Sequence, residues 1–284
     1  MRQRSYLHQN TVNSYLLNNE EMKRTVVLLK VILFYLASLV IFAFSAGVTK
    51  QTIFPDLFSL SIATLLSFGL VCLFKAWDKI NFSQIGLGFN HKSMLNFGLG
   101  LCVGICMVGI MAIILTNFAA VSFQKSVSFD TKIWATVIPL YFFVACREEL
   151  VFRTYFLWRL KDGFGTIASL SIIVVFFILE HLFTGSTLKT AILGSGLGAI
   201  LFGFATLRTR NIALSIGLHF GWNLTHWLFG FKGNTGLFIE TVAKDTEYHS
   251  ENIAFVAYTI AMLLGLLTVA ILLKKIQPPN SPIT

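Results

Sequence analysis

Long apolar stretches, separated by short polar segments, occupy almost the whole chain. Each stretch is about 18–25 residues long, which is the length that a helix needs to cross a hydrocarbon core of ~30 Å. Only helices and closed barrels satisfy the backbone in hydrocarbon, and these stretches lack the strict alternation of barrel strands. They lie at residues 26–48, 54–74, 94–118, 133–157, 166–183, 190–207, 212–231 and 253–273. The pattern predicts an all-α fold, a polytopic membrane helix bundle with about eight transmembrane helices.

The two ends of the chain differ from this pattern. Residues 1–25 are polar and rich in asparagine, and we predict a tail with little reason to be ordered. The first apolar stretch is too long for the core of a cleavable signal peptide, so we expect it to remain as an anchor. Residues 26–275 are predicted to form the bundle, and residues 276–284 a disordered tail.

Composition supports a membrane protein and excludes an ordinary soluble domain. Hydrophobic residues make up 55% and charged residues 12% of the chain, against ~45–50% and ~25% in soluble domains. The formal net charge of +9 comes from short basic clusters between the apolar stretches. This pattern is typical of membrane orientation and not of a nucleic-acid-binding face. We therefore expect the lipid bilayer, and no nucleic acid, as a partner.

The distribution of lysine and arginine predicts the orientation of the bundle. Thirteen of these residues fall in segments on the same side as the N-terminus, and six fall in segments on the other side. The positive-inside rule therefore places both termini in the cytoplasm. We expect an integral, multi-pass protein in the plasma membrane of a prokaryote.

Glycines four residues apart predict close contacts between helices. Gly100 and Gly104 in the third stretch match the small-xxx-small pattern of membrane helix pairs. Gly217 and Gly221 in the seventh stretch leave its backbone accessible to a neighbour.

Four ionisable residues interrupt the fourth apolar stretch within one segment of seven residues, Arg147 to Arg153. Each charge near the centre of a bilayer costs at least ~2.5–3.5 kcal/mol. A helix end that reaches toward the lipid headgroups accounts for the arginines, but it accounts poorly for the adjacent carboxylates of Glu148 and Glu149. The segment therefore indicates a functional site.

Polar residues on two further stretches are expected to join this segment. Glu180 and His181 lie near the end of the fifth stretch, and His219, Asn223 and His226 lie in the seventh. A lone histidine in a helix is more often a hydrogen-bonded packing residue. Several polar residues on three membrane helices are too costly to face lipid, so we expect them to turn inward and converge.

Helical spacing suggests a role for each group. Glu149 and Arg153 are four residues apart and can pair, so we predict that they form a structural clamp. Glu148 is turned about 100° away and is the free carboxylate, suited to a general base. His219 and Asn223 also share a face. Together with His181 and Glu148 they can hold a water and polarise a peptide carbonyl.

A zinc site is the competing chemistry. Zinc binds two histidines and a carboxylate with one open position, and His181, His219 and Glu148 supply that set. The HExxH pattern of many zinc proteases is absent from the sequence. We favour the metal-free form, with no cofactor expected and zinc as the alternative.

Three motifs of this region resemble those of the CPBP family (CAAX protease and bacteriocin-processing), which comprises membrane proteases. EExxxR stands at Glu148–Arg153, FxxxH at Phe177–His181 and HxxxN at His219–Asn223. The order is the family's, and the resemblance covers the core at residues 133–231. It implies a helical bundle with its site inside the membrane. It also implies catalysis by a glutamate of the first motif and the two motif histidines, assisted by the asparagine.

Two features depart from a simple reading of this resemblance. Glu180 stands where a small residue is expected before the histidine, and it can either tune His181 or face the opposite side. His181 also lies near the outer end of its stretch, whereas His219 begins its stretch near the inner side. A strong tilt or a shifted start of the fifth helix is needed to bring the two together.

We therefore expect an intramembrane endopeptidase of glutamic or metallo type, acting on a membrane-associated peptide or protein. One alternative is a non-proteolytic membrane scaffold or immunity protein that keeps the pocket. Another is a transporter that uses Glu148 and the histidines as a proton relay. The lack of an evident inverted repeat counts against a transporter.

Overall fold

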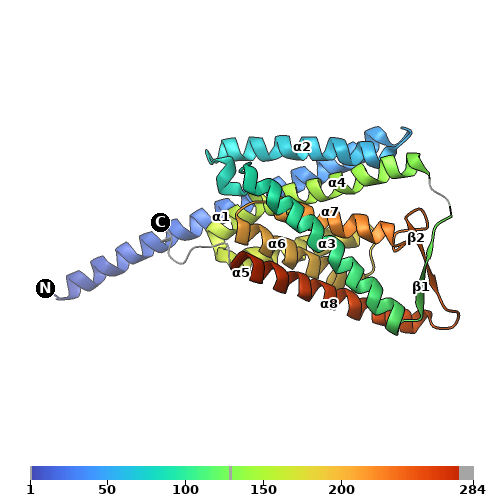
Figure 1. The fold of residues 1–284 in the computed structure, drawn as a ribbon. Helices are drawn as coiled ribbons and strands as arrows, with labels where there is room; N and C mark the ends of the chain where they lie inside the picture. The colour runs from blue at the N-terminus through green and yellow to red at the C-terminus, as the bar shows by residue number, and fades with distance from the viewer. Residues whose placement is uncertain (1, 128–129, 275–284) are drawn as a thin grey trace.

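Eight α-helices form the bundle in the computed structural model, which describes residues 2–127 and 130–274 (Figure 1). The helices are α1 (Arg2–Thr49), α2 (Pro55–Trp77), α3 (His91–Phe118), α4 (Thr131–Arg153), α5 (Tyr155–Phe183), α6 (Leu197–Thr209), α7 (Ala213–Leu228) and α8 (Glu247–Lys274). A 3₁₀-helix, η1 (Phe82–Ile85), precedes α3, and a π-helix, η2 (Thr190–Gly196), leads into α6. The predicted all-α class is confirmed.

Six stretches of the described chain are long and apolar enough to cross a membrane. The predicted number of about eight differs for two reasons. Helices α4 and α5 are almost continuous and form one stretch, Thr131–Phe183. Helix α7 has only 16 residues, or ~24 Å at 1.5 Å per residue, so it is short for a span. Ten of its residues are buried, which places α7 inside the bundle.

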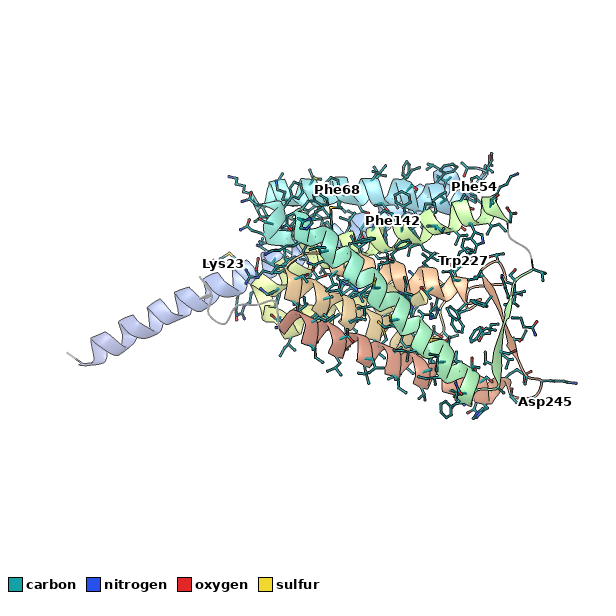
Figure 2. The ribbon with its side chains drawn as sticks, viewed as in Figure 1. Lys23, Phe54, Phe68, Phe142, Trp227 and Asp245 are labelled. Carbon is teal, nitrogen blue, oxygen red and sulfur yellow. The ribbon has the colours of Figure 1, made fainter. Side chains whose placement is uncertain are left out.

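Large apolar side chains cover the outside of the bundle, as the bilayer requires. Along α2, for example, Leu65 is 70% exposed and Phe68 is 45% exposed, and Figure 2 shows side chains projecting from this outer helix. The apolar surface and the long helices together describe an integral, multi-pass membrane protein.

The ends of several helices differ from the predicted positions. Helix α1 begins at Arg2, so the structure continues the first helix through the segment predicted as a polar tail. Helix α4 ends at Arg153, and α5 begins at Tyr155 and is kinked at Gly165 (φ 82°, ψ 173°). The part of α5 after this kink begins at the predicted position, residue 166, and the part before it extends back to Tyr155. The predicted tail at residues 276–284 lies outside the described part of the chain.

Helices α3 and α7 approach each other closely through the predicted glycines. A Cβ atom on Gly100 would lie 2.3 Å from the carbonyl oxygen of Leu214, and one on Gly217 would lie 2.2 Å from that of Phe97. Gly104 and Gly221 face the partner backbone at similarly short distances. Any larger side chain would force the helices apart, so these glycines fix the position of α7.

A small antiparallel sheet closes the end of the bundle remote from the N-terminus (Figure 1). Strand β1 (Val121–Lys125) pairs with β2 (Phe238–Val242), and Phe123 lies opposite Glu240. The sheet was not predicted. It holds the segment between α7 and β2 against the end of α7, because Gly230 fits closely against the backbone of Phe238 and Glu240.

Candidate active site

The last turns of α4 carry the charged segment into the interior of the bundle. Glu149 and Arg153 have no exposed surface, and Arg147 is 2% exposed. Glu148 is partly exposed, with 16% of its side chain accessible. The bundle thus buries three of the four charged groups and leaves Glu148 as the accessible carboxylate.

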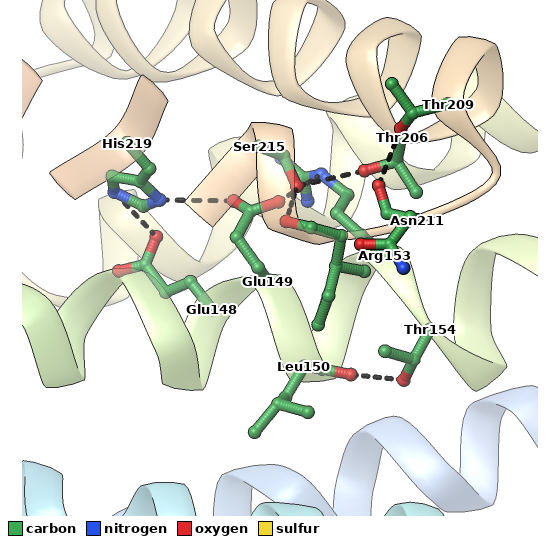
Figure 3. A network of polar contacts seen from close by, with 11 residues as sticks. Glu148, Glu149, Leu150, Arg153, Thr154, Thr206, Thr209, Asn211, Ser215 and His219 are labelled. Carbon is green, nitrogen blue, oxygen red and sulfur yellow. Dashed lines mark hydrogen bonds and ion pairs between the residues drawn. The ribbon is translucent and has the colours of Figure 1, made fainter. Parts of the chain in front are cut away.

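His219 of α7 lies between the two adjacent glutamates (Figure 3). Its Nδ1 donates to Oε1 of Glu149 at 3.1 Å, and its Nε2 lies 3.8 Å from Oε2 of Glu148. The ring stacks on Phe202 of α6, with centroids 4.7 Å apart and an interplanar angle of 14°. The imidazole is therefore held in one orientation by a carboxylate and an aromatic ring.

The position of His219 depends on contacts of residues that lie one turn earlier in α7 and just before its start. Ser215, four residues before His219, accepts a hydrogen bond from Thr206 of α6 at 3.0 Å. The side chain of Asn211 accepts from the backbone of Ala213 at 2.8 Å and so fixes the start of α7. Figure 3 shows the contact between Thr206 and Ser215 beside the two glutamates.

Glu149 also lies next to Arg153, the residue predicted as its partner. Arg153 Nε is 3.5 Å from Glu149 Oε2. The guanidinium group lies over the ring of Phe177 at 5.1 Å and of Phe202 at 6.0 Å. One buried cation therefore contacts Glu149 and the aromatic residue of the FxxxH motif.

Asn223 lies one helical turn beyond His219 and is 7% exposed. Its Oδ1 accepts a hydrogen bond from Lys232 Nζ at 2.8 Å, and the ammonium group also lies 4.8 Å from the ring of Tyr141 on α4. Sequence reasoning missed Lys232, because a lysine just after an apolar stretch looks like an ordinary flanking charge. Its position nine residues after Asn223 carries no helical signal.

In the described part of the chain, the hydrogen bond and the ring contact of the His181 side chain, at the end of α5, are both with Phe177 of its own motif. Its Nδ1 donates to the carbonyl oxygen of Phe177 at 2.9 Å, and its ring lies against the Phe177 ring. No hydrogen bond or ion pair joins His181 to Glu148, His219 or Asn223 in the described part of the chain. The link between the motifs runs through Phe177, which contacts both His181 and Arg153.

Glu180 does not interact with His181 but pairs with Arg147 of α4. Tyr35 of α1 donates to the same carboxylate at 3.4 Å, and the guanidinium group of Arg147 lies over Phe42 of α1 at 4.6 Å. Of the two positions considered for Glu180, the one facing away from the histidine is therefore observed. The participation of α1 was not predicted.

His226 continues the stripe of His219 and Asn223 along α7 but lies in aromatic surroundings. Its ring is 4.5 Å from Trp222 and 4.9 Å from Phe231. No contact joins it to the glutamates among the described residues, so we leave it out of the site.

The predicted zinc ligands are not assembled in this arrangement. Among residues 2–127 and 130–274, no three His, Cys, Asp or Glu side chains are grouped as a metal site. Only His219 and Glu148 of the predicted set lie near each other, since His181 stays with Phe177. We derive no step through zinc, and metal analysis of the purified protein tests that alternative.

Comparison with known proteins adds one finding. A family model described as type II CAAX prenyl endopeptidase Rce1-like matches residues 130–225. This segment runs from the start of α4 into α7 and holds all three motifs. No curated protein and no solved structure matched the chain. The match supports the resemblance found in the sequence: residues 130–225 are similar to this family of membrane endopeptidases.

Proposed function

We propose that this protein is an intramembrane endopeptidase that hydrolyses a peptide bond of a membrane-associated peptide or protein. The observation that carries the proposal is the position of His219 between Glu149 and Glu148. The carboxylate of Glu149 orients the imidazole through Nδ1. The carboxylate of Glu148 lies near Nε2, on the accessible side of the site. We further propose that both termini face the cytoplasm of a prokaryote.

The hydrogen bond to Glu149 selects the tautomer of His219. Because Nδ1–H donates to Glu149, the lone pair of Nε2 is directed toward Glu148. The Nε2–Oε2 separation of 3.8 Å is too long for a hydrogen bond. This separation allows one water molecule to bridge the two groups, with one hydrogen donated to Nε2 of His219 and the other to Oε2 of Glu148.

Glu148 is the proposed general base. Its Oε2 is buried and has no hydrogen-bond partner in the described chain, so it is available to take a proton. As the water oxygen attacks the peptide carbonyl carbon, its proton passes to Glu148. The same proton then passes to the amide nitrogen as the C–N bond breaks, which regenerates the carboxylate.

Asn223 is the proposed donor to the carbonyl oxygen as it becomes negative. Because its Oδ1 accepts from Lys232, its NH₂ group, on the opposite edge of the amide, points away from Lys232. An amide donor held in this way stabilises an oxyanion without further reorganisation. Lys232 is therefore a positioning residue for Asn223.

His181 is the remaining motif residue. Its Nδ1–H is used by Phe177, which leaves Nε2 as the nitrogen that is free to act. Since His181 does not contact Glu148, we propose that it meets the substrate from the α5 side.

The test is a cleavage assay on the purified protein with peptide libraries in lipid nanodiscs. Wild type should cleave a subset of membrane-associated peptides, and Glu148→Gln should cleave none while keeping the wild-type melting temperature. Asp162→Asn, an exposed carboxylate on α5, is the matched control and should keep full activity. Full activity in Glu148→Gln would reject the proposed base.

A further inference from the structure

A cavity lies at the end of the bundle where α3 begins and α6 meets α7. Its volume is about 950 Å³, and its walls come from η1, the start of α3, the junction of α6 and α7 and the end of α8. None of the catalytic candidates lines it. The cavity is therefore separate from the proposed active site, and the proposed protease function does not explain it.

The cavity is lined by three cations and no carboxylate. Lys92, Arg208 and Arg210 all contribute to its wall, and no Asp or Glu does. No ion pair joins any of the three to an acid within the described chain. Like charges gathered at one wall repel each other, and a bound anion removes that repulsion.

Two hydrogen-bond donors at the same cavity lack acceptors. The indole Nε1 of Trp158 and the guanidinium Nε of Arg208 are buried and have no partner within the described residues. Trp158 is only 8% exposed, so bulk water does not satisfy its indole readily. A buried donor without an acceptor is unfavourable, and both donors belong to residues that line the cavity.

The backbone also holds one of these cations in an unusual conformation. Arg210 follows α6 in the left-handed region, with φ 51° and ψ 31°. Glycine or asparagine relaxes such a position, whereas arginine is strained there. The presence of arginine at this strained position suggests that its positive side chain is needed at the cavity.

An apolar pocket adjoins the charged cavity. It has a volume of about 460 Å³ and shares Gly88, Ser93 and Asn211 with the cavity. Its other walls include Met94, Phe97 and Phe142 of α3 and α4. A ligand that fits both spaces has an anionic head and a hydrocarbon chain.

We propose that the cavity binds the phosphate group of an anionic phospholipid, with an acyl chain in the adjoining apolar pocket. Arginine matches phosphate oxygens with paired hydrogen bonds, and the indole of Trp158 adds one more donor. Basic pockets between membrane helices bind lipid headgroups in this way. Inorganic phosphate carries the same charged group, and the experiment separates the two sources.

The proposal is tested by native mass spectrometry of the full-length protein in detergent. The probes are phosphatidylglycerol and phosphatidylcholine, each with and without millimolar inorganic phosphate. Wild type should bind phosphatidylglycerol about tenfold more tightly than phosphatidylcholine. The double variant Arg208→Gln/Arg210→Gln should lose this preference, and Trp158→Phe should weaken it by about threefold, since one donor is removed.

The matched control removes two positive charges at the same end of the bundle. Lys75 and Lys79 do not line the cavity, so Lys75→Gln/Lys79→Gln should bind lipid as wild type does. If the arginine variant does not fold, Lys92→Gln replaces it, because Lys92 is an exposed residue of the cavity wall. This variant should also reduce the preference for phosphatidylglycerol.

Displacement of the lipid by phosphate supports the anion site and identifies free phosphate as a ligand. Equal binding of the two lipids together with no phosphate binding would overturn the proposal, as would equal loss in the lysine control.

Discussion

Arg147 of α4 and Glu180 of α5 form a buried ion pair on the side of α4 that faces away from Glu149. Two residues along a helix correspond to a turn of about 200°, so Arg147 and Glu149 point in opposite directions. One face of α4 is thus tied to α5 and α1, while the other face carries the proposed active site.

This pair should stabilise the fold more than it serves the reaction. Arg147→Met or Glu180→Met alone leaves a buried charge without its partner and should lower the free energy of unfolding by about 3–5 kcal/mol. The double variant Arg147→Met/Glu180→Met removes both charges and should be closer to wild type than either single variant. Thermal melting in detergent measures this, and additive losses in the double variant would show that the two residues act independently.

Glu149 and Glu148 should respond differently to the same substitution. Glu149→Gln weakens the contacts to Arg153 and His219 and should destabilise the protein by about 3–5 kcal/mol, since both partners are buried. The one close polar contact of Glu148 among the described residues is the 3.8 Å contact to His219, so Glu148→Gln should change the melting temperature far less than Glu149→Gln. Melting curves of the two variants, recorded together, provide the comparison. Equal destabilisation would contradict the division of roles.

Lys232 should act on the reaction only through Asn223. Asn223→Ala should lower kcat by about 10²–10³, the usual cost of one oxyanion donor, with little change in KM. Lys232→Met should lower kcat by about tenfold, which corresponds to loss of one charged hydrogen bond, and Lys232→Arg should restore most of it. Kinetics of the double variant decide the mechanism, because Lys232→Met should have no further effect once Asn223 is alanine. A further tenfold loss of kcat in the double variant would show that Lys232 acts independently of Asn223.

Asp78 connects α2 with α1 and α5 and should make stability depend on pH. Burial raises the pKa of its carboxyl group, but hydrogen bonds from Lys30 and Tyr155 and the charge of Arg159 outweigh burial, so the pKa is lowered overall. A carboxyl group with a lowered pKa in the folded state contributes stability above its unfolded pKa of about 3.9, and this contribution is lost as the pH falls toward the folded pKa.

Melting temperatures of wild type and Asp78→Asn measure this contribution. Wild type should be the more stable protein at neutral pH, and the difference should shrink as the pH falls below about 4. A difference that stays constant over this range would show that the charge of Asp78 is not responsible.

The orientation of the bundle is tested by reporter fusions. The thirteen-to-six distribution of basic residues predicts that the segment after α7 lies on the outer side. A reporter fused after Gly233 should therefore read as external, and a cytoplasmic reading there would reverse the assignment.

The sequence predicted those features that depend on local pattern. Apolar length located all eight helices, and glycine spacing located the contact of Gly100 and Gly217. The cost of charge in lipid indicated that the polar residues turn inward, and Glu148, Glu149 and His219 do meet.

The features that were missed depend on the tertiary structure. The break at Thr154 lies inside a continuous apolar stretch, where hydrophobicity carries no information on where the chain turns. The partners of Arg147 and Asn223 come from α5 and from the segment after α7. Neither partner lies at a helical spacing that would identify it from the sequence.

The most direct test of the central claim is the cleavage rate of Glu148→Gln relative to wild type on one identified peptide substrate in nanodiscs. The substitution keeps the shape of the side chain but removes the base that accepts the proton of the water. We predict that cleavage falls below detection while the melting temperature stays at the wild-type value. Cleavage at the wild-type rate by folded Glu148→Gln would contradict the account.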